Sequence, residues 1–156
     1  MKKAIVVSGC PGTGKTKVAK LISKKRGCEY VGTKNVINEF GLVEGYDKKM
    51  KSFIVDTDKL SKVLVGLIKK STKTLVIDGH LSHYVPRKYV KLCIITKCDI
   101  KILKKRLERR GYSKSKVRDN LDAEIFDTCH VEALEFGHKI KVIDTSKGIR
   151  PSSLAL

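Results

Sequence analysis

Eight residues near the start of the chain have the types and spacing of a phosphate-binding loop. Gly9-Cys10-Pro11-Gly12-Thr13-Gly14-Lys15-Thr16 matches the pattern in which four residues separate a glycine from Gly-Lys-Thr. Glycines let successive backbone N–H groups turn toward phosphate oxygens, and a helix that starts there adds partial positive charge. We expect Lys15 to reach the β and γ phosphates of a nucleotide and the Thr16 hydroxyl to ligate Mg2+.

An acidic residue at the end of an apolar run is the candidate partner of that loop. Residues 75–77, Leu-Val-Ile, resemble a buried strand, and Asp78 follows them directly. A carboxylate there can hold the metal opposite Thr16, although an Asp at a strand end can also cap the next loop. Since a magnesium nucleotide needs a hard oxygen ligand, we predict that Asp78 and Thr16 are the metal ligands.

Histidine and arginine side chains complete the set of candidates. His80, two positions beyond Asp78, could orient a water or a substrate oxygen, whereas we interpret His83 as structural. Arg106, Arg109 and Arg110 surround the end of a predicted helix. They either complement the helix dipole or close as a clamp over the triphosphate, and the phosphate loop favours the clamp.

Short apolar runs alternate with helical patterns along the chain. The runs are rich in Val and Ile, as strands buried on both faces are, and they lie at 4–7, 75–77, 90–95 and 140–143. The predicted helices cover 15–25, 58–69 with Asp58 as its cap, 99–109, and one long stretch from Ser113 to Phe136. This alternation predicts an α/β fold of the P-loop NTPase class, three layers α/β/α around a mainly parallel sheet.

Bulk properties narrow the class of protein. We expect the 156 residues to form one domain, with 41% hydrophobic and 32% charged residues indicating a globular chain. The apolar runs are far shorter than the about 20 residues of a membrane helix, so no membrane partner is expected. Five cysteines without paired spacings argue against a disulfide framework or zinc site, and favour a reducing, cytoplasmic compartment.

The charge is strongly positive. Thirty-four Lys and Arg against sixteen Asp and Glu give a formal charge of +18, far more than one bound nucleotide requires. A solvated surface and a footprint for RNA or a ribonucleoprotein explain this excess equally well, because charge alone attracts phosphate backbones without specificity.

Several segments together resemble one known family. The phosphate loop is followed by Gly45-Tyr46-Asp47, Asp78-Gly79-His80, the segment 106–113 (Arg-Leu-Glu-Arg-Arg-Gly-Tyr-Ser) and the segment 120–126. This combination resembles the atypical small adenylate kinases of the adenylate kinase isoenzyme 6 family, in its archaeal form. The resemblance runs from about Lys3 to Lys147.

That resemblance implies a nucleoside monophosphate kinase fold that converts Mg-ATP and AMP into two ADP. An insert at about 31–55 would receive AMP and a short lid at about 110–120 would close over the site, with Lys15, Asp78, His80 and Arg110 as catalytic residues. The implied AMP contacts are Asn35 and Arg106. The implied ATP contacts are Gly12, Thr13, Gly14, Lys15, Thr16, Lys17, Arg110 and Lys147.

Three functions fit these residues. Members of the resembled family are described as small-subunit ribosome assembly factors that engage a ribosomal protein and hydrolyse ATP, so rRNA and a ribosomal protein are implied partners. The first hypothesis is the AMP kinase and the second is an ATP-switched ribosome assembly factor. A P-loop kinase of a small metabolite is the third, because phosphoryl transfer depends on positioning and charge and the sequence names no acceptor.

Overall fold

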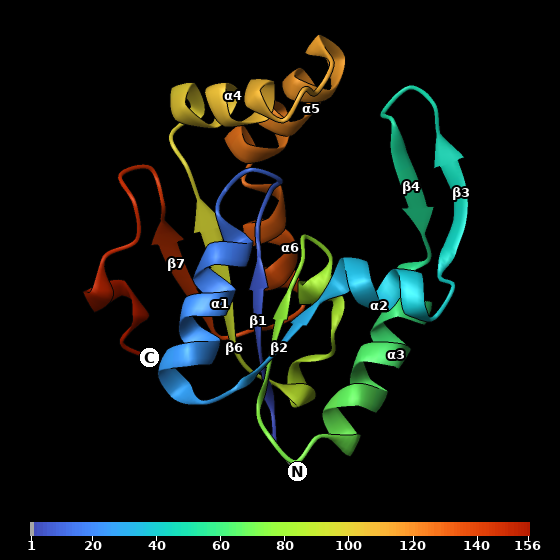
Figure 1. The fold of residues 1–156 in the computed structure, drawn as a ribbon, viewed down its shortest axis with the longest axis vertical. Coiled ribbons are helices and arrows are strands. Elements are labelled where there is room, and N and C mark those ends of the chain that lie inside the picture. The colour runs from blue at the N-terminus through green and yellow to red at the C-terminus, as the bar shows by residue number, and fades with distance from the viewer. Residues whose placement is uncertain (1) are drawn as a thin grey trace.

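A parallel five-stranded sheet forms the centre of the molecule in the computed structural model, which describes residues 2–156 (Figure 1). The strand order is β2-β5-β1-β6-β7, and every neighbouring pair runs parallel. The strands are β1 (Ala4–Ser8), β2 (Glu29–Gly32), β5 (Leu75–Asp78), β6 (Val90–Lys97) and β7 (Ile140–Asp144).

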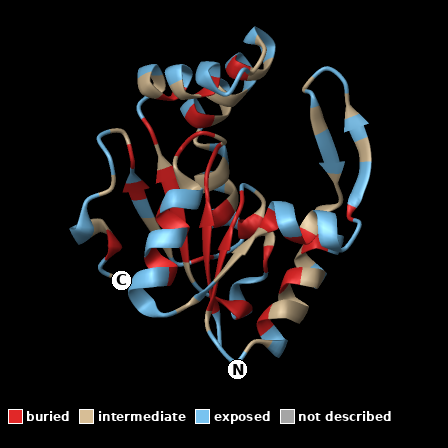
Figure 2. Ribbon diagram, viewed as in Figure 1, coloured by how far each residue is buried: buried red, intermediate tan, exposed pale blue. Residues whose placement is uncertain are grey.

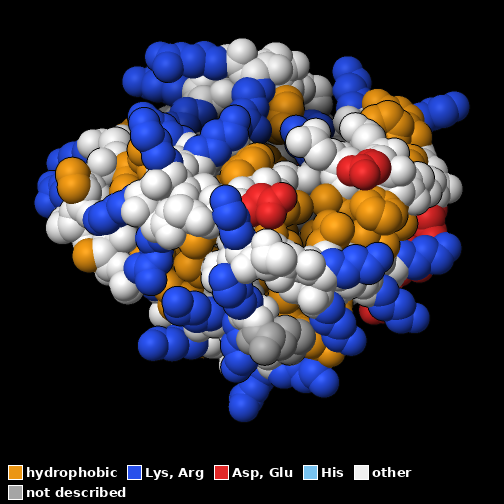
Figure 3. All heavy atoms as spheres, turned by 60° about the horizontal axis from the view of Figure 1, so that its bottom comes forward, with side chains coloured by type: hydrophobic (Ala, Val, Ile, Leu, Met, Phe, Trp, Pro, Cys, Tyr) orange, Lys and Arg blue, Asp and Glu red, His pale blue; other side chains and the backbone are white. Residues whose placement is uncertain are grey.

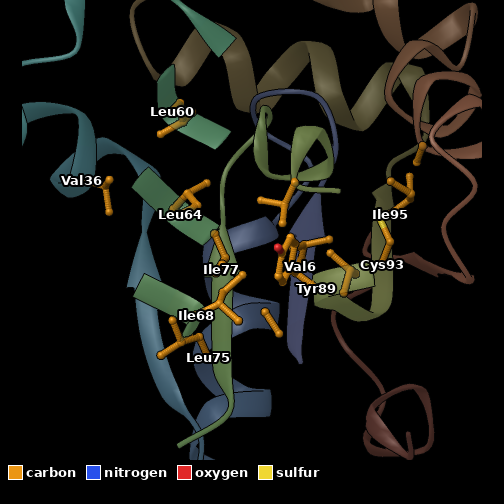
Figure 4. Close-up of a cluster of buried hydrophobic side chains, with 14 of the residues drawn as sticks. Val6, Val36, Leu60, Leu64, Ile68, Leu75, Ile77, Tyr89, Cys93 and Ile95 are labelled. Atoms are coloured by element: carbon orange, nitrogen blue, oxygen red, sulfur yellow. The ribbon is translucent and has the colours of Figure 1, made fainter. Parts of the chain in front are cut away.

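Helices cover both faces of this sheet. Alternate residues of β1 point to opposite faces, Ala4 and Val6 to one core and Ile5 and Val7 to the other. The first core packs against α2 (Thr33–Glu39), α3 (Thr57–Lys70) and α6 (Thr128–Glu135), and Figure 4 shows Leu64 and Ile68 of α3 near Ile77, in the same cluster as Leu60. The second packs against α1 (Lys15–Arg26) and the C-terminal turn (Pro151–Leu154). The predicted three-layer α/β/α class is confirmed.

Two further units lie above the carboxyl ends of the strands. The helices α4 (Ile100–Arg109) and α5 (Lys114–Ile125) cross this end of the sheet around their own small core of Cys98, Leu103, Leu107 and Val117 (Figure 1). On the other side stands an antiparallel hairpin of β3 (Val43–Asp47) and β4 (Ser52–Val55), whose surface is largely exposed (Figure 2). The Lys116 amine donates to the Lys51 carbonyl at 3.3 Å and joins the two units.

Three details of the sequence interpretation are wrong. The stretch 113–136 is two helices, because the backbone at Asp127 takes a left-handed φ of 57° and ends α5. The cap of α3 is Asp56, whose carboxylate accepts the N–H groups of Asp58 and Lys59, and not Asp58. Residues 29–32 were not predicted as a strand, although they form the edge of the main sheet beside β5.

The segment 31–55 therefore has a mixed placement. Its beginning belongs to the main sheet, its middle is α2, and its end is the hairpin.

Within residues 2–156, no helix combines the length and apolar character required to cross a bilayer.

Gly79 and Gly66 allow a matched test of how tightly the helices pack around the sheet. A methyl group on Gly79 would collide with the Thr33 side chain at the start of α2, whereas one on Gly66 in α3 would meet open space. We predict that Gly79→Ala destabilises the fold by about 1–3 kcal/mol through overpacking. Gly66→Ala should stabilise it by about 0.5–1 kcal/mol, because alanine loses less entropy in a helix. Urea unfolding followed by circular dichroism measures both, and equal stability of the two variants would contradict the packing described.

Candidate functional site

The phosphate loop connects the fully buried strand β1 to the first turn of α1. Gly9, Gly12 and Gly14 have φ values of 144°, 85° and 89°, in the region that residues with a Cβ rarely adopt. A Cβ on Gly9 would also meet Thr96 and Thr13. The glycine positions of the sequence pattern are thus required by the backbone path, which wraps tightly above the strand ends.

Buried hydroxyl groups hold this loop from below. The Thr13 hydroxyl lies 2.6 Å from the Cys10 carbonyl and 2.7 Å from the Thr96 hydroxyl, and both threonines are fully buried. The Thr145 hydroxyl lies 2.6 Å from the Thr13 carbonyl oxygen. These bonds tie the loop to the ends of β6 and β7, so the cradle is rigid before any ligand enters.

The two predicted metal ligands are in contact. The Thr16 hydroxyl donates to Asp78 Oδ2 at 2.6 Å, and the Tyr30 hydroxyl donates to the same oxygen at 2.7 Å. Burial and then this bond raise the pKa of Tyr30 to about 12, so the phenol remains a donor. Asp78 is only 6% exposed, at the end of β5 beside β1. The geometry places one carboxylate oxygen beside a hydroxyl group at the mouth of the loop.

This donor pair suits a magnesium ion that is carried in with a nucleotide. A hydroxyl and a carboxylate are hard oxygen ligands, and Mg2+ in such sites takes one or two protein ligands together with phosphates and waters. Within residues 2–156, no cluster of three or more His, Cys, Asp or Glu side chains could form a complete metal cage. A magnesium site at Thr16 and Asp78 would therefore need the phosphates of the substrate.

Lys15 is also held in the loop. Its amine donates to the Cys10 carbonyl at 3.1 Å. Burial lowers the pKa of Lys15, while the charge of Asp78 acts in the opposite direction. An entering phosphate would replace the Cys10 carbonyl as the acceptor, because a charged oxygen is the stronger partner for an ammonium group.

A basic hollow opens on the side of the loop next to β7. Arg106, Arg109, Arg110 and Lys17 line it, with its floor formed by Gly12, Gly14, Thr145, Gly148 and Ile149. Lys147 is exposed in the same turn as Gly148. A nucleoside polyphosphate requires such a lining, with cations around its phosphates and a small apolar surface beside its nucleoside.

Arg106 lies on this side of the loop. Its guanidinium donates to the Gly12 carbonyl at 3.2 Å and to the Thr145 carbonyl at 2.7 Å. It therefore braces the phosphate loop, and its neighbours are the residues that we expected to contact ATP. Asn35, the other expected AMP contact, is an exposed residue of α2. That Arg106 and Asn35 contact AMP stays a prediction, and in this structure Arg106 lies against the phosphate loop.

His80 and His83 have different environments. The His83 ring is fully buried, with Nδ1 2.7 Å from the Ser8 hydroxyl and Nε2 3.2 Å from Glu132 Oε1. Part of His80 is exposed to solvent, but the protein atoms around its ring, and then the charge of Lys15, lower its pKa to about 4. Solvent weakens a shift of this kind at an exposed residue, but its direction leaves His80 neutral at pH 7.

An ion-pair network fixes the base of α5 to the sheet. Glu124 is 5% exposed and accepts the Cys98 N–H at 2.8 Å, while the Lys97 amine lies 2.9 Å from Glu124 and 2.6 Å from Asp127. Hydrogen bonds to Asp127 and Glu124 raise the pKa of Lys97 against the effect of burial. The arginines of α4 thus sit on a helical hairpin that is fastened at its base.

Sequence reasoning missed Tyr30, Thr96, Thr145 and Glu124 as parts of the site. A tyrosine or threonine in a strand is ordinary by type, and only the parallel register brings Tyr30 beside Asp78. The signal available for Thr145 was its place two positions after the run 140–143, where the carboxyl ends of parallel strands meet.

Fold and site together define a P-loop kinase. Solved structures of similar fold include a shikimate kinase from Acinetobacter baumannii, at 15% identity, TM-score 0.66, and 95% and 86% coverage of the two chains. A second is a shikimate kinase from Bacteroides thetaiotaomicron, at 12% identity, TM-score 0.62, and 97% and 91% coverage. At these identities the likeness is one of fold.

Sequence relatives are more specific. Residues 5–127 match the family described as AAA domain. A protein of Thermococcus onnurineus named "Putative adenylate kinase" is 39% identical over 142 residues, which are 91% of this chain and 74% of the relative. One of the same name from Methanocaldococcus jannaschii is 34% identical, over 91% of this chain and 76% of the relative. The chain belongs to this AAA domain family of P-loop kinases. Within that family it belongs with the proteins named putative adenylate kinase.

The lowered pKa of His80 makes a prediction about stability. The ordinary histidine pKa is 6.5 and the folded value is lower, so between these values the unfolded chain binds a proton that the folded one does not. Proton binding by His80 therefore lowers the free energy of unfolding as the pH falls below about 6.5, and it has no effect above that pH. We predict that the Tm of His80→Asn falls less than the Tm of the native protein when the pH is lowered from about 7.5 to about 5. An unchanged loss in thermal melts would contradict the assigned environment.

Proposed function

We propose that the protein is an adenylate kinase that transfers the γ-phosphoryl group of Mg-ATP to AMP and yields two ADP. The observation that carries this proposal is the Thr16–Asp78 pair at 2.6 Å, at the mouth of a phosphate loop flanked by three arginines. Relatives named putative adenylate kinase at 34–39% identity support the choice of AMP as acceptor.

The donor side is assigned to the basic hollow. The loop N–H groups and Lys15 bind the β and γ phosphates, and the nucleoside of ATP lies toward Gly148 and Ile149. Thr16 and Asp78 would hold Mg2+, which would neutralise charge on the phosphates. Arg109 and Arg110, both exposed, approach the phosphates, while Arg106 keeps the loop in shape.

The acceptor side is assigned to α2 and the β3–β4 hairpin. These elements rise beside the loop opposite to α4 and α5 (Figure 1), and Asn35 lies on α2. The AMP phosphate oxygen attacks the γ phosphorus as the bond to the β–γ bridging oxygen breaks. No base is required because the attacking oxygen already carries charge, so the protein contributes position and charge neutralisation. Neutral His80 can donate a hydrogen bond to a phosphate oxygen.

A second candidate function is an ATPase that acts in assembly of the small ribosomal subunit. The specific observation in its favour is the charge of +18, and Figure 3 shows many Lys and Arg scattered over the face in view, with few acidic side chains. Such a surface attracts RNA strongly at low salt. This candidate uses the same donor side and differs in the acceptor, which would be water.

The deciding experiment measures ATP turnover with and without AMP, with ADP and inorganic phosphate followed separately. We predict two ADP formed per AMP consumed and little free phosphate. Free phosphate that forms without AMP and increases on addition of rRNA or a small-subunit ribosomal protein would favour the assembly ATPase. Binding to RNA should weaken steeply with added salt in either case.

Removal of single groups tests the assigned site. Lys15→Met and Asp78→Asn should each lower ATP-dependent transfer by at least about 100-fold, the scale of one lost charge-stabilising group. Arg87→Gln, which changes a cation outside the site, is the matched control and should leave turnover within about twofold. Transfer retained by Lys15→Met would overturn the assignment of the phosphate loop.

A further inference from the structure

Two hydroxyl groups from different elements share one oxygen of the Asp78 carboxylate. Thr16, at the start of α1, donates to Oδ2 at 2.6 Å, and Tyr30, in the edge strand β2, donates to it at 2.7 Å. None of the hydrogen bonds among residues 2–156 reaches Oδ1. The carboxylate therefore turns Oδ2 toward both hydroxyls, and Oδ1 remains for a further ligand, such as a metal ion or a water bound to it.

The hydroxyl of Tyr30 has no role in the chemistry assigned so far. Thr16 is itself a proposed metal ligand, whereas Tyr30 makes its contact with Asp78. Such a contact matters because the last torsion of an aspartate is broad, so the orientation of its carboxylate depends on its hydrogen-bond partners. The bond from Tyr30 fixes this orientation without occupying a position on the metal.

Packing holds the Tyr30 hydroxyl in place. Gly32 lies opposite Asp78 in the parallel register, and Tyr30 is two positions earlier, on the same face of β2. A Cβ on Gly32 would lie 3.2 Å from the Tyr30 hydroxyl oxygen, so the missing side chain leaves the room that the phenol needs. The ring packs on the second core, and the Lys20 amine lies 5.3 Å from its centroid. The donor is thus fixed before a ligand enters.

We propose that Tyr30 is a positioning residue of the metal site, whose hydroxyl holds the Asp78 carboxylate in the orientation that binds Mg2+ together with ATP. The inference rests on the proposed function only where that function assigns Mg2+ to Thr16 and Asp78. It does not depend on whether the acceptor is AMP, a metabolite or water.

Replacement of Tyr30 by phenylalanine isolates the hydroxyl. The ring and its packing remain, while Asp78 loses the donor that orients it. Loss of a hydrogen bond that orients a metal ligand costs about 10–100-fold in metal affinity or activity. Binding of the nucleotide without metal should stay the same, since Lys15 and the basic hollow are unchanged. Tyr30→Phe should therefore weaken only the part of nucleotide binding that Mg2+ contributes.

Calorimetric titration measures this part directly. The probe is a non-hydrolysable ATP analogue with an imido group between its β and γ phosphorus atoms, titrated once with Mg2+ and once with a chelator. With Mg2+, Tyr30→Phe should bind the analogue at least about tenfold more weakly than the native protein, and without Mg2+ the two should agree within about twofold.

Tyr84→Phe is the matched control for this titration. Tyr84 is also half-buried and also donates to a carboxylate, Glu132 Oε2 at 2.8 Å, which is not a proposed metal ligand. Both variants lose one bond between a hydroxyl and a carboxylate, so any general effect on the fold is common to them. Tyr84→Phe should bind the analogue like the native protein with Mg2+ and without it.

A double-mutant comparison separates positioning from other effects of the mutation. In the Asp78→Ala background the carboxylate is absent, so Tyr30→Phe should change the affinity with Mg2+ by less than about twofold. Equal affinities of the native protein and Tyr30→Phe with Mg2+, or an unchanged loss in the Asp78→Ala background, would overturn the proposal. If Mg2+ has no effect on binding by the native protein, the metal site fails together with this inference. Failure of AMP phosphorylation alone leaves the predicted titrations unchanged.

Discussion

The hydroxyl of Thr13 holds together the part of the molecule on which the proposed chemistry depends. A phosphate cradle needs its backbone N–H groups turned inward, and glycines with left-handed φ values permit that path but do not enforce it. The bonds from Thr13 to Cys10 and Thr96, and from Thr145 to the Thr13 carbonyl, fix it. Because these groups are buried, each would be costly to leave unpaired, and the ends of β1, β6 and β7 are held in one arrangement.

From this fixed centre the remaining parts differ in how firmly they are attached. The helical hairpin α4–α5 is braced at its base by Glu124 and above the loop by Arg106. The β3–β4 hairpin has no comparable buried anchor, and its Tyr46 and Phe53 rings, 51% and 68% exposed, pack edge to face with their centroids 5.3 Å apart. Such an element moves at low cost, which suits a part that must admit one substrate and release another.

Much of this arrangement follows from sequence, and the reasons for the misses are physical. The run 4–7 is apolar on both faces and precedes glycines, so strand, loop and helix were predictable together. Strand β2, by contrast, reads Glu-Tyr-Val-Gly, half-exposed at a sheet edge and without a continuous apolar pattern. The break at Asp127 needs a left-handed backbone at a residue that is neither glycine nor proline, stabilised by Lys97 from a distant strand. Long-range pairs of this kind, such as Tyr30 with Asp78, depend on the register between strands β2 and β5. The local pattern of apolar residues does not determine that register.

The most direct test of the two-nucleotide site is titration with a single molecule that carries adenosine at both ends of a five-phosphate chain, followed by calorimetry and backbone NMR. A site for ATP beside a site for AMP predicts one molecule per chain, bound far more tightly than ATP, with shifts both at Gly148 and Ile149 and at α2 around Asn35. Affinity equal to that of ATP, with shifts confined to the loop and the basic hollow, would contradict the adenylate kinase account and leave a P-loop protein with one nucleotide site.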